Sequence, residues 1–152
     1  MKRITFLVIV LVIALCCSCR YIHNDGFTAA DPDEIVVNIH NTCNSDIYGV
    51  HIEYYLGNKA VGGHIASCTP EMDVAFKKGD IICNAIPKEA FLPNEELEGF
   101  GIETFVILKG GMEVGAGDII KWDAEFGKTY EMVLSNSGNN GEYYLSLNYE
   151  YA

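Results

Sequence analysis

The feature of this sequence that most limits its fold is a period of two in hydrophobicity, which recurs after residue 34. In Glu142–Tyr151, every second residue from Tyr143 onward is apolar or aromatic, and residues 47–56 alternate in the same way. Successive side chains of a strand point to opposite sides, so this pattern is typical of β-strands with one buried face. Shorter segments rich in apolar residues lie between turn-forming residues, at 34–41, 80–85, 101–108, 118–124 and 129–134. The pattern predicts an all-β domain.

The number and spacing of these segments indicate the architecture. Seven to eight antiparallel strands separated by turns predict a single β-sandwich of the immunoglobulin-like type, with a small β-barrel as the alternative. The chain has 152 residues, the size of one ordinary domain, which we place at residues 34–152. Pro87–Leu97 departs from the alternation and predicts one short helix that begins at the proline, followed by an exposed loop.

A tight turn at residues 56–59 fixes the expected pairing of two strands. Its sequence is Leu-Gly-Asn-Lys, and glycine at the first central position accepts a positive φ. If pairing continues from this turn without interruption, His51 lies directly opposite His64, with Glu53 nearby. Opposed side chains have Cβ atoms about 5 Å apart. The two imidazoles could then bind a transition metal with Glu53 as third ligand, or form a pH-sensitive pair. The alternative is two exposed histidines that face each other without function.

The same pairing brings Cys68 close to Cys43, which lies in the loop before residue 47. We therefore predict a Cys43–Cys68 disulfide, although three reduced cysteines remain the alternative. A zinc set made of His40, Cys43, His64 and Cys68 would compete with the disulfide for the same thiols. Cys83 lies in an apolar run and is predicted to be a buried, inert thiol.

Two tyrosines fall on the polar sides of their predicted strands. Tyr55 and Tyr144 are out of phase with the apolar residues around them, whereas Trp122 and Tyr143 are in phase and predict core positions. Exposed tyrosines can anchor a protein partner or a sugar, so both are candidate binding residues.

The first 19 residues read MKRITFLVIVLVIALCCSC, which is a short basic start followed by an apolar run. The run is about a dozen residues long, whereas a membrane-spanning helix needs about 20. This length is typical of the apolar core of a secretory signal. The run ends in cysteines and resembles the lipobox of bacterial lipoproteins, in which small residues precede the cysteine that receives the lipid. Ser18 precedes Cys19, which is the preferred lipidation site, with Cys17 and Cys16 as alternatives.

The resemblance implies a signal peptide at residues 1–18, a lipidated Cys19 with a flexible tether at 19–33, and an extracytoplasmic domain anchored to a bacterial membrane through its lipid. The formal charge of −11 disfavours nucleic acid, because phosphate backbones repel an acidic surface. The sequence has no H-E-x-x-H, no G-x-S-x-G and no phosphate-binding loop. We therefore expect a non-catalytic binding or structural role without a cofactor, with an envelope protein, peptide or glycan as partner. A metal-binding or pH-sensing lipoprotein and an envelope hydrolase with a spatially assembled site are the alternatives.

Overall fold

The computed structural model describes residues 30–68, 74–92, 96–137 and 141–148, and the side chains of 62–68 lie outside this description. The predicted signal peptide, Cys16, Cys17, Cys19 and most of the predicted tether also lie outside it. Within the described ranges, no helix has the length and apolar character needed to cross a membrane.

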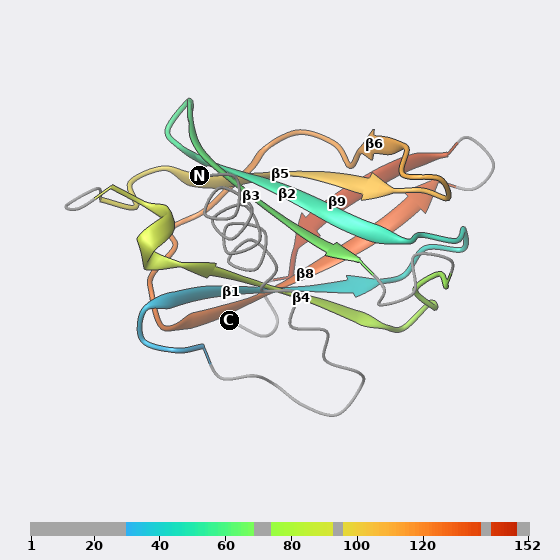
Figure 1. Cartoon of the computed structure of the whole chain (residues 1–152), viewed down its shortest axis with the longest axis horizontal. Coiled ribbons are helices and arrows are strands. Elements are labelled where there is room, and N and C mark those ends of the chain that lie inside the picture. The colour runs from blue at the N-terminus through green and yellow to red at the C-terminus, as the bar shows by residue number, and fades with distance from the viewer. Residues whose placement is uncertain (1–29, 69–73, 93–95, 138–140, 149–152) are drawn as a thin grey trace, which may run out of the picture.

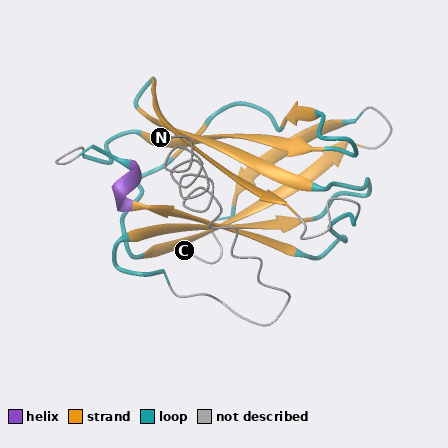
Figure 2. Cartoon of the chain, viewed as in Figure 1, coloured by secondary structure: helices purple, strands orange, loops and turns teal. Residues whose placement is uncertain are grey.

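The described strands form two sheets that pack face to face (Figures 1 and 2). The four-stranded sheet has the order β4-β1-β8-β9 and contains β1 (Glu34–Asn41), β4 (Ile81–Pro87), β8 (Lys128–Ser137) and β9 (Glu142–Leu147). The five-stranded sheet has the order β3-β2-β5-β6, and β7 also pairs with β5. Its strands are β2 (Gly49–Leu56), β3 (Lys59–Cys68), β5 (Phe100–Ile107), β6 (Glu113–Gly115) and β7 (Ile120–Lys121). The predicted all-β, sandwich-like architecture is confirmed, and the two sheets do not close into the barrel considered as the alternative.

One strand pair differs from the antiparallel arrangement that the sequence predicted. β1 runs parallel to β8, with Ile35 opposite Lys128 and Asn41 opposite Leu134. Parallel neighbours cannot be joined by a tight turn and need a long connection. Here the connection contains β4 and all the strands of the five-stranded sheet. β1 is an inner strand, with β8 on one side and β4 on the other.

The core follows from the alternation of side chains. Ile35, Val37 and Ile39 of β1 have no solvent exposure, and neither do Val50 and Ile52 of β2. These residues point from both sheets into one shared interior. Burial of such aliphatic side chains contributes roughly 1.5–3 kcal/mol each, which makes this interior the main source of stability.

Aromatic residues fill one end of the sandwich. Phe91 contacts Phe100 and Phe126, and the Phe100 ring meets Trp122 edge-on with 4.8 Å between centroids. Phe91 directly follows the 3₁₀ helix η1 (Lys88–Ala90), which confirms the short helix expected after Pro87. Trp122 is half-buried and also packs on Tyr130, with 5.4 Å between centroids. This cluster determines the shape of the nearby pocket described below.

Candidate functional site

The pairing of β2 with β3 changes register partway along the hairpin. Near the turn, Leu56 lies opposite Lys59 as predicted, but beyond a bulge Glu53 lies opposite His64. The prediction that His51 faces His64 is wrong, because His51 lies opposite Ala66. β3 has two extra residues in the bulge, where the sequence has adjacent glycines at 62 and 63. An extra pair of residues preserves the inward and outward alternation, so the apolar faces still match.

The predicted metal ligands are only partly brought together. His51 and Glu53 lie on the outer face of the five-stranded sheet, and His51 Nδ1 is 3.2 Å from Glu113 Oε2. Among the side chains that the structure describes, no group of three His, Cys, Asp or Glu residues has a geometry suited to a metal ion. The side chain of His64 lies outside the described residues, so a site that includes it stays a prediction.

This outer face carries a group of polar and aromatic side chains that we call the acidic face. It consists of His51, Glu53, Tyr55, Glu103, Phe105 and Glu113. Glu53 lies directly opposite Glu103, an arrangement that is unfavourable for two like charges. The Tyr55 hydroxyl lies 2.8 Å from Glu103 Oε2 and 3.3 Å from Glu53 Oε2. Its single proton can be donated to only one carboxylate at a time.

The two carboxylates change the chemistry of the tyrosine. Hydrogen bonding to Glu103, followed by burial, the charge of Glu103 and the contact with Glu53, raises the pKa of Tyr55 to about 12. Tyr55 therefore remains a neutral donor at physiological pH. The sequence predicted an exposed anchor, whereas the structure shows a half-buried phenol that bridges two acids.

The aromatic part of the acidic face lies beside this acid pair. His51 lies opposite Phe105, and their rings are 5.5 Å apart with an interplanar angle of 34°. The side chain of His51 is 15% exposed. The two rings therefore lie side by side on the outer face of the sheet, with only part of the imidazole in contact with solvent.

Tyr144 lies on the other sheet and does not join Tyr55 in one site. It is 46% exposed on β9, and its hydroxyl donates to Glu142 Oε2 at 2.6 Å. This contact raises the pKa of Tyr144, an effect that the Ser137 hydroxyl partly offsets. Tyr144 is thus an exposed residue, as predicted, on a surface separate from the acidic face.

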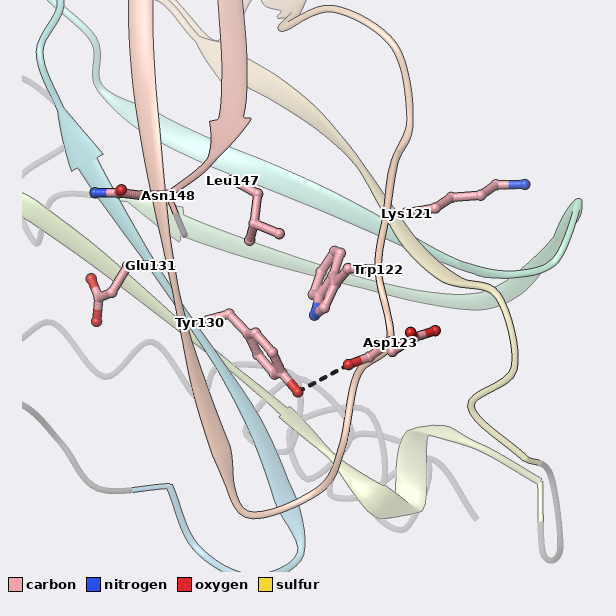
Figure 3. Close-up of a pocket in the computed structure, with 7 residues that line it drawn as sticks. All are labelled: Lys121, Trp122, Asp123, Tyr130, Glu131, Leu147 and Asn148. Carbon is pink, nitrogen blue, oxygen red and sulfur yellow. Dashed lines mark hydrogen bonds between the residues drawn. The ribbon is translucent and has the colours of Figure 1, made fainter. Parts of the chain in front are cut away.

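A pocket of 340 Å³ lies where β7, β8 and the end of β9 meet. Its lining is formed by Lys121, Trp122, Asp123, Tyr130, Glu131, Leu147 and Asn148. Figure 3 shows that the side chains of Trp122, Tyr130 and Leu147 point toward one another, whereas those of Lys121 and Glu131 point away. The interior of the pocket is therefore apolar and aromatic, with charges only at its margins.

A buried polar cluster on the four-stranded sheet was missed by the sequence analysis. Glu131 is 4% exposed, accepts a hydrogen bond from Asn38 Nδ2 at 2.9 Å, and lies 2.5 Å from His40 Nε2. Alternation alone places these residues on an outer face, where exposure is expected. Only the parallel pairing of β1 with β8 brings them together, and no local sequence signal reveals that pairing.

The cysteines in the described residues lie in different environments. Cys43 is a buried free thiol whose Sγ is 3.7 Å from the Leu134 carbonyl, and burial raises its pKa. Cys68 lies opposite Gly49 at the end of β3, and its side chain is outside the described residues. Because Cys43 is a free thiol, the structure does not contain the predicted Cys43–Cys68 disulfide. Its formation on oxidation stays a prediction. Cys83 is half-buried on β4 and not fully buried as expected.

The sequence was compared with protein-family models and with curated proteins. No protein-family model matches the sequence, and no curated protein matches it. Functional inference therefore depends on the residues of this chain alone.

Proposed function

We propose that this chain is an extracytoplasmic lipoprotein, anchored to a bacterial membrane at Cys19, whose β-sandwich binds a neutral glycan of the cell envelope without catalysis. The address is supported by the basic start, the apolar run and the cysteines of the first 19 residues. The binding role is supported by the acidic face.

The observation that carries the binding role is the opposed pair Glu53 and Glu103. The two carboxylates have four acceptor oxygens, and in the described contacts they share one phenolic proton from Tyr55. Sugar hydroxyls are neutral donors that suit such acceptors, and the apolar side of a sugar ring suits the neighbouring Phe105 ring. The net charge of −11 disfavours an anionic ligand.

Calorimetric titration with neutral envelope oligosaccharides tests the binding role. Glu103→Gln should weaken binding about tenfold or more, because hydrogen bonds to a charged group contribute roughly 1.5–3 kcal/mol. Phe105→Ala should weaken it as well. Tyr144→Ala, on the other sheet, is the matched control and should bind normally. Equal affinity in all variants, or binding of a lysine-rich peptide in place of a glycan, would contradict the proposal.

The anchor is tested separately from the ligand. Mass spectrometry of the protein recovered from membranes should show cleavage before Cys19 and acyl chains on that residue. Cys19→Ser should release the protein from the membrane fraction. Acyl chains on Cys17 or Cys16 would show that one of these residues, and not Cys19, is the lipidation site. An intact Met1 would contradict the proposal that the chain is processed and lipid-anchored.

We further infer that the sandwich is of the immunoglobulin-like type. Its support is Tyr130, near the start of β8, whose hydroxyl accepts the Glu125 N–H at 2.8 Å and lies 3.4 Å from the Asp123 carbonyl. A tyrosine that hydrogen-bonds back to the preceding loop in this way is a hallmark of that fold type, the tyrosine corner. A crystal structure with strand connections foreign to that fold type would contradict this inference.

A metal-binding role is the second candidate. It is favoured by the corrected register, which places His64 opposite Glu53 and on the same strand pair as His51. Calorimetry with zinc and copper should then show binding that His64→Ala abolishes. If neither metal releases heat, this alternative is wrong and the glycan proposal is unaffected.

A further inference from the structure

Cys83 lies on the outer face of the four-stranded sheet. Its neighbours in β4, Ile82 and Asn84, are buried toward the core, so the alternation of the strand directs the Cys83 side chain outward. The thiol is reduced, and the residue is half-buried. Cys43, by contrast, is 2% exposed and lies within the core. Of these two cysteines, Cys83 is therefore the more accessible to a small molecule.

The strand register places this thiol next to a polar cluster. Cys83 lies directly opposite Asn38, and His40 is two residues further along β1 on the same face. Diagonal neighbours of this kind are about 7–8 Å apart, within reach of long side chains. The same diagonal relation on the other side of β1 brings His40 Nε2 to 2.5 Å from Glu131 Oε2. β1 thus carries an imidazole between a thiol on β4 and a carboxylate on β8.

The contacts of the carboxylate determine how the imidazole is held. Glu131 is 4% exposed and contacts Nε2 of His40, so Nδ1 is the remaining ring nitrogen. Asn38 lies between the acid and the thiol, and its Nδ2 donates to Glu131 Oε1 at 2.9 Å. The side chain of His40 is 35% exposed, so solvent reaches the imidazole. A nucleophile, a base and a group that orients the base are the parts by which proteins activate a thiol.

We propose that Cys83 is a reactive thiol that takes up low-molecular-weight disulfides, with His40 as its base and Glu131 as the residue that positions the base. In this reaction the thiol proton passes to His40, and the Cys83 sulfur attacks one sulfur of the disulfide. The S–S bond of the reagent breaks, and a new S–S bond joins Cys83 to one half of it. The other half leaves as a thiolate and takes the proton from His40. The site is on the sheet opposite to the acidic face, so it is independent of the proposed glycan binding.

Timed labelling of the full chain with 2-hydroxyethyl disulfide, a small neutral disulfide, tests the proposal. Trypsin cuts after Lys78 and Lys88, and the peptide between these cuts contains Cys83 as its only cysteine. Mass mapping of this peptide therefore measures the rate at Cys83 alone. At neutral pH the rate in the folded parent should exceed the rate in urea-unfolded parent about fivefold or more, because an activated thiol has a larger thiolate fraction.

The variants separate the roles of the three side chains. His40→Gln should slow the reaction of Cys83 about fivefold or more, because it removes the base. Glu131→Gln should slow it as well, because the imidazole loses the group that orients it. Cys43 reports on the fold in the same digest, since it should stay unlabelled as long as the domain is folded. Ser146→Ala, at an exposed position of the same outer face, is the matched control and should react at the parent rate.

Three results would overturn the proposal. The first is a rate in the folded parent that does not exceed the rate in the unfolded chain. The second is a parent-like rate in His40→Gln while Cys43 stays unlabelled. The third is an equal loss of rate in His40→Gln and Ser146→Ala, because the effect would then not depend on the imidazole.

Discussion

His40 and Glu131 meet on the outward side of the four-stranded sheet, with 2.5 Å between Nε2 and Oε2. They come from parallel neighbouring strands, and Asn38 completes the contacts of the carboxylate. Breaking such a pair leaves a carboxylate with little water to replace the lost partner, because Glu131 is only 4% exposed.

His40→Ala should therefore destabilise the domain by about 1–3 kcal/mol, since a buried acceptor loses a charge-assisted hydrogen bond. Urea unfolding measures the loss. Asp33→Asn is the control, because Asp33 and its partner Lys88 are both more than half exposed. That exposed pair should contribute less than about 1 kcal/mol. Equal losses in the two variants would show that the burial of Glu131 has no energetic consequence.

The Tyr55 phenol should make stability depend on alkaline pH. Its pKa is raised from 10.0 to about 12 in the folded state, with the hydrogen bond to Glu103 as the main cause. A raised pKa favours the protonated form on folding, so its contribution is complete below pH 10 and is lost between pH 10 and 12. Glu103→Gln should lower the pKa of Tyr55, as measured by ultraviolet absorbance of tyrosinate. A titration curve identical to that of the parent would exclude Glu103 as the cause.

Gly101 allows β7 to approach β5 closely. A Cβ atom at this position would lie 3.0 Å from Ile119 Cγ2, from the Ile120 carbonyl and from Lys121 Cγ. Gly101→Ala should cost about 1–3 kcal/mol through overpacking, measured by thermal unfolding. Gly115→Ala is the matched strand control, because its Cβ would meet nothing within 4 Å. Destabilisation by Gly115→Ala but not by Gly101→Ala would contradict the described packing.

The Cys43 thiol should resist alkylation in the folded protein. Burial raises its pKa and shields its sulfur, so the reactive thiolate is scarce at neutral pH. Iodoacetamide followed by peptide mass mapping should leave Cys43 unlabelled until the protein is unfolded. Unfolding without reductant then separates two states, because a free Cys43 becomes labelled whereas one bonded to Cys68 does not. Rapid labelling in the folded state would contradict its burial.

Much of the fold could be predicted because alternation is a local property. The inward positions of β2, Val50, Ile52 and Tyr54, follow from polarity alone and are buried in the structure. Segment limits were less accurate where few residues pair. The strand expected at 118–124 is only Ile120–Lys121, because β7 meets β5 through two residue pairs.

The candidate site was harder to predict because it depends on register. The turn at Gly57 predicts the correct pairing partners of Tyr55 and Leu56. Beyond them, the bulge shifts the register, so that His64 lies opposite Glu53 and not opposite His51. Adjacent glycines in a strand are a recognisable bulge signal, and they could have warned against continuous pairing. By contrast, the contacts of Glu103 with Tyr55 cross between strands 48 residues apart. No pattern within either segment reveals such a contact.

The parallel placement of β1 beside β8 also determines when the domain can assemble. Asn38 and Glu131 are 93 residues apart in the chain. β1 can therefore pair with β8 only after nearly all of the described residues have been synthesised. Pairing over such separations makes folding slow, on a scale of milliseconds to seconds. A growing chain that has not yet reached Lys128 has an inner strand with one side unfilled, and an unpaired strand edge invites association with other chains. Such a chain cannot complete the four-stranded sheet until β8 and β9 are available for pairing.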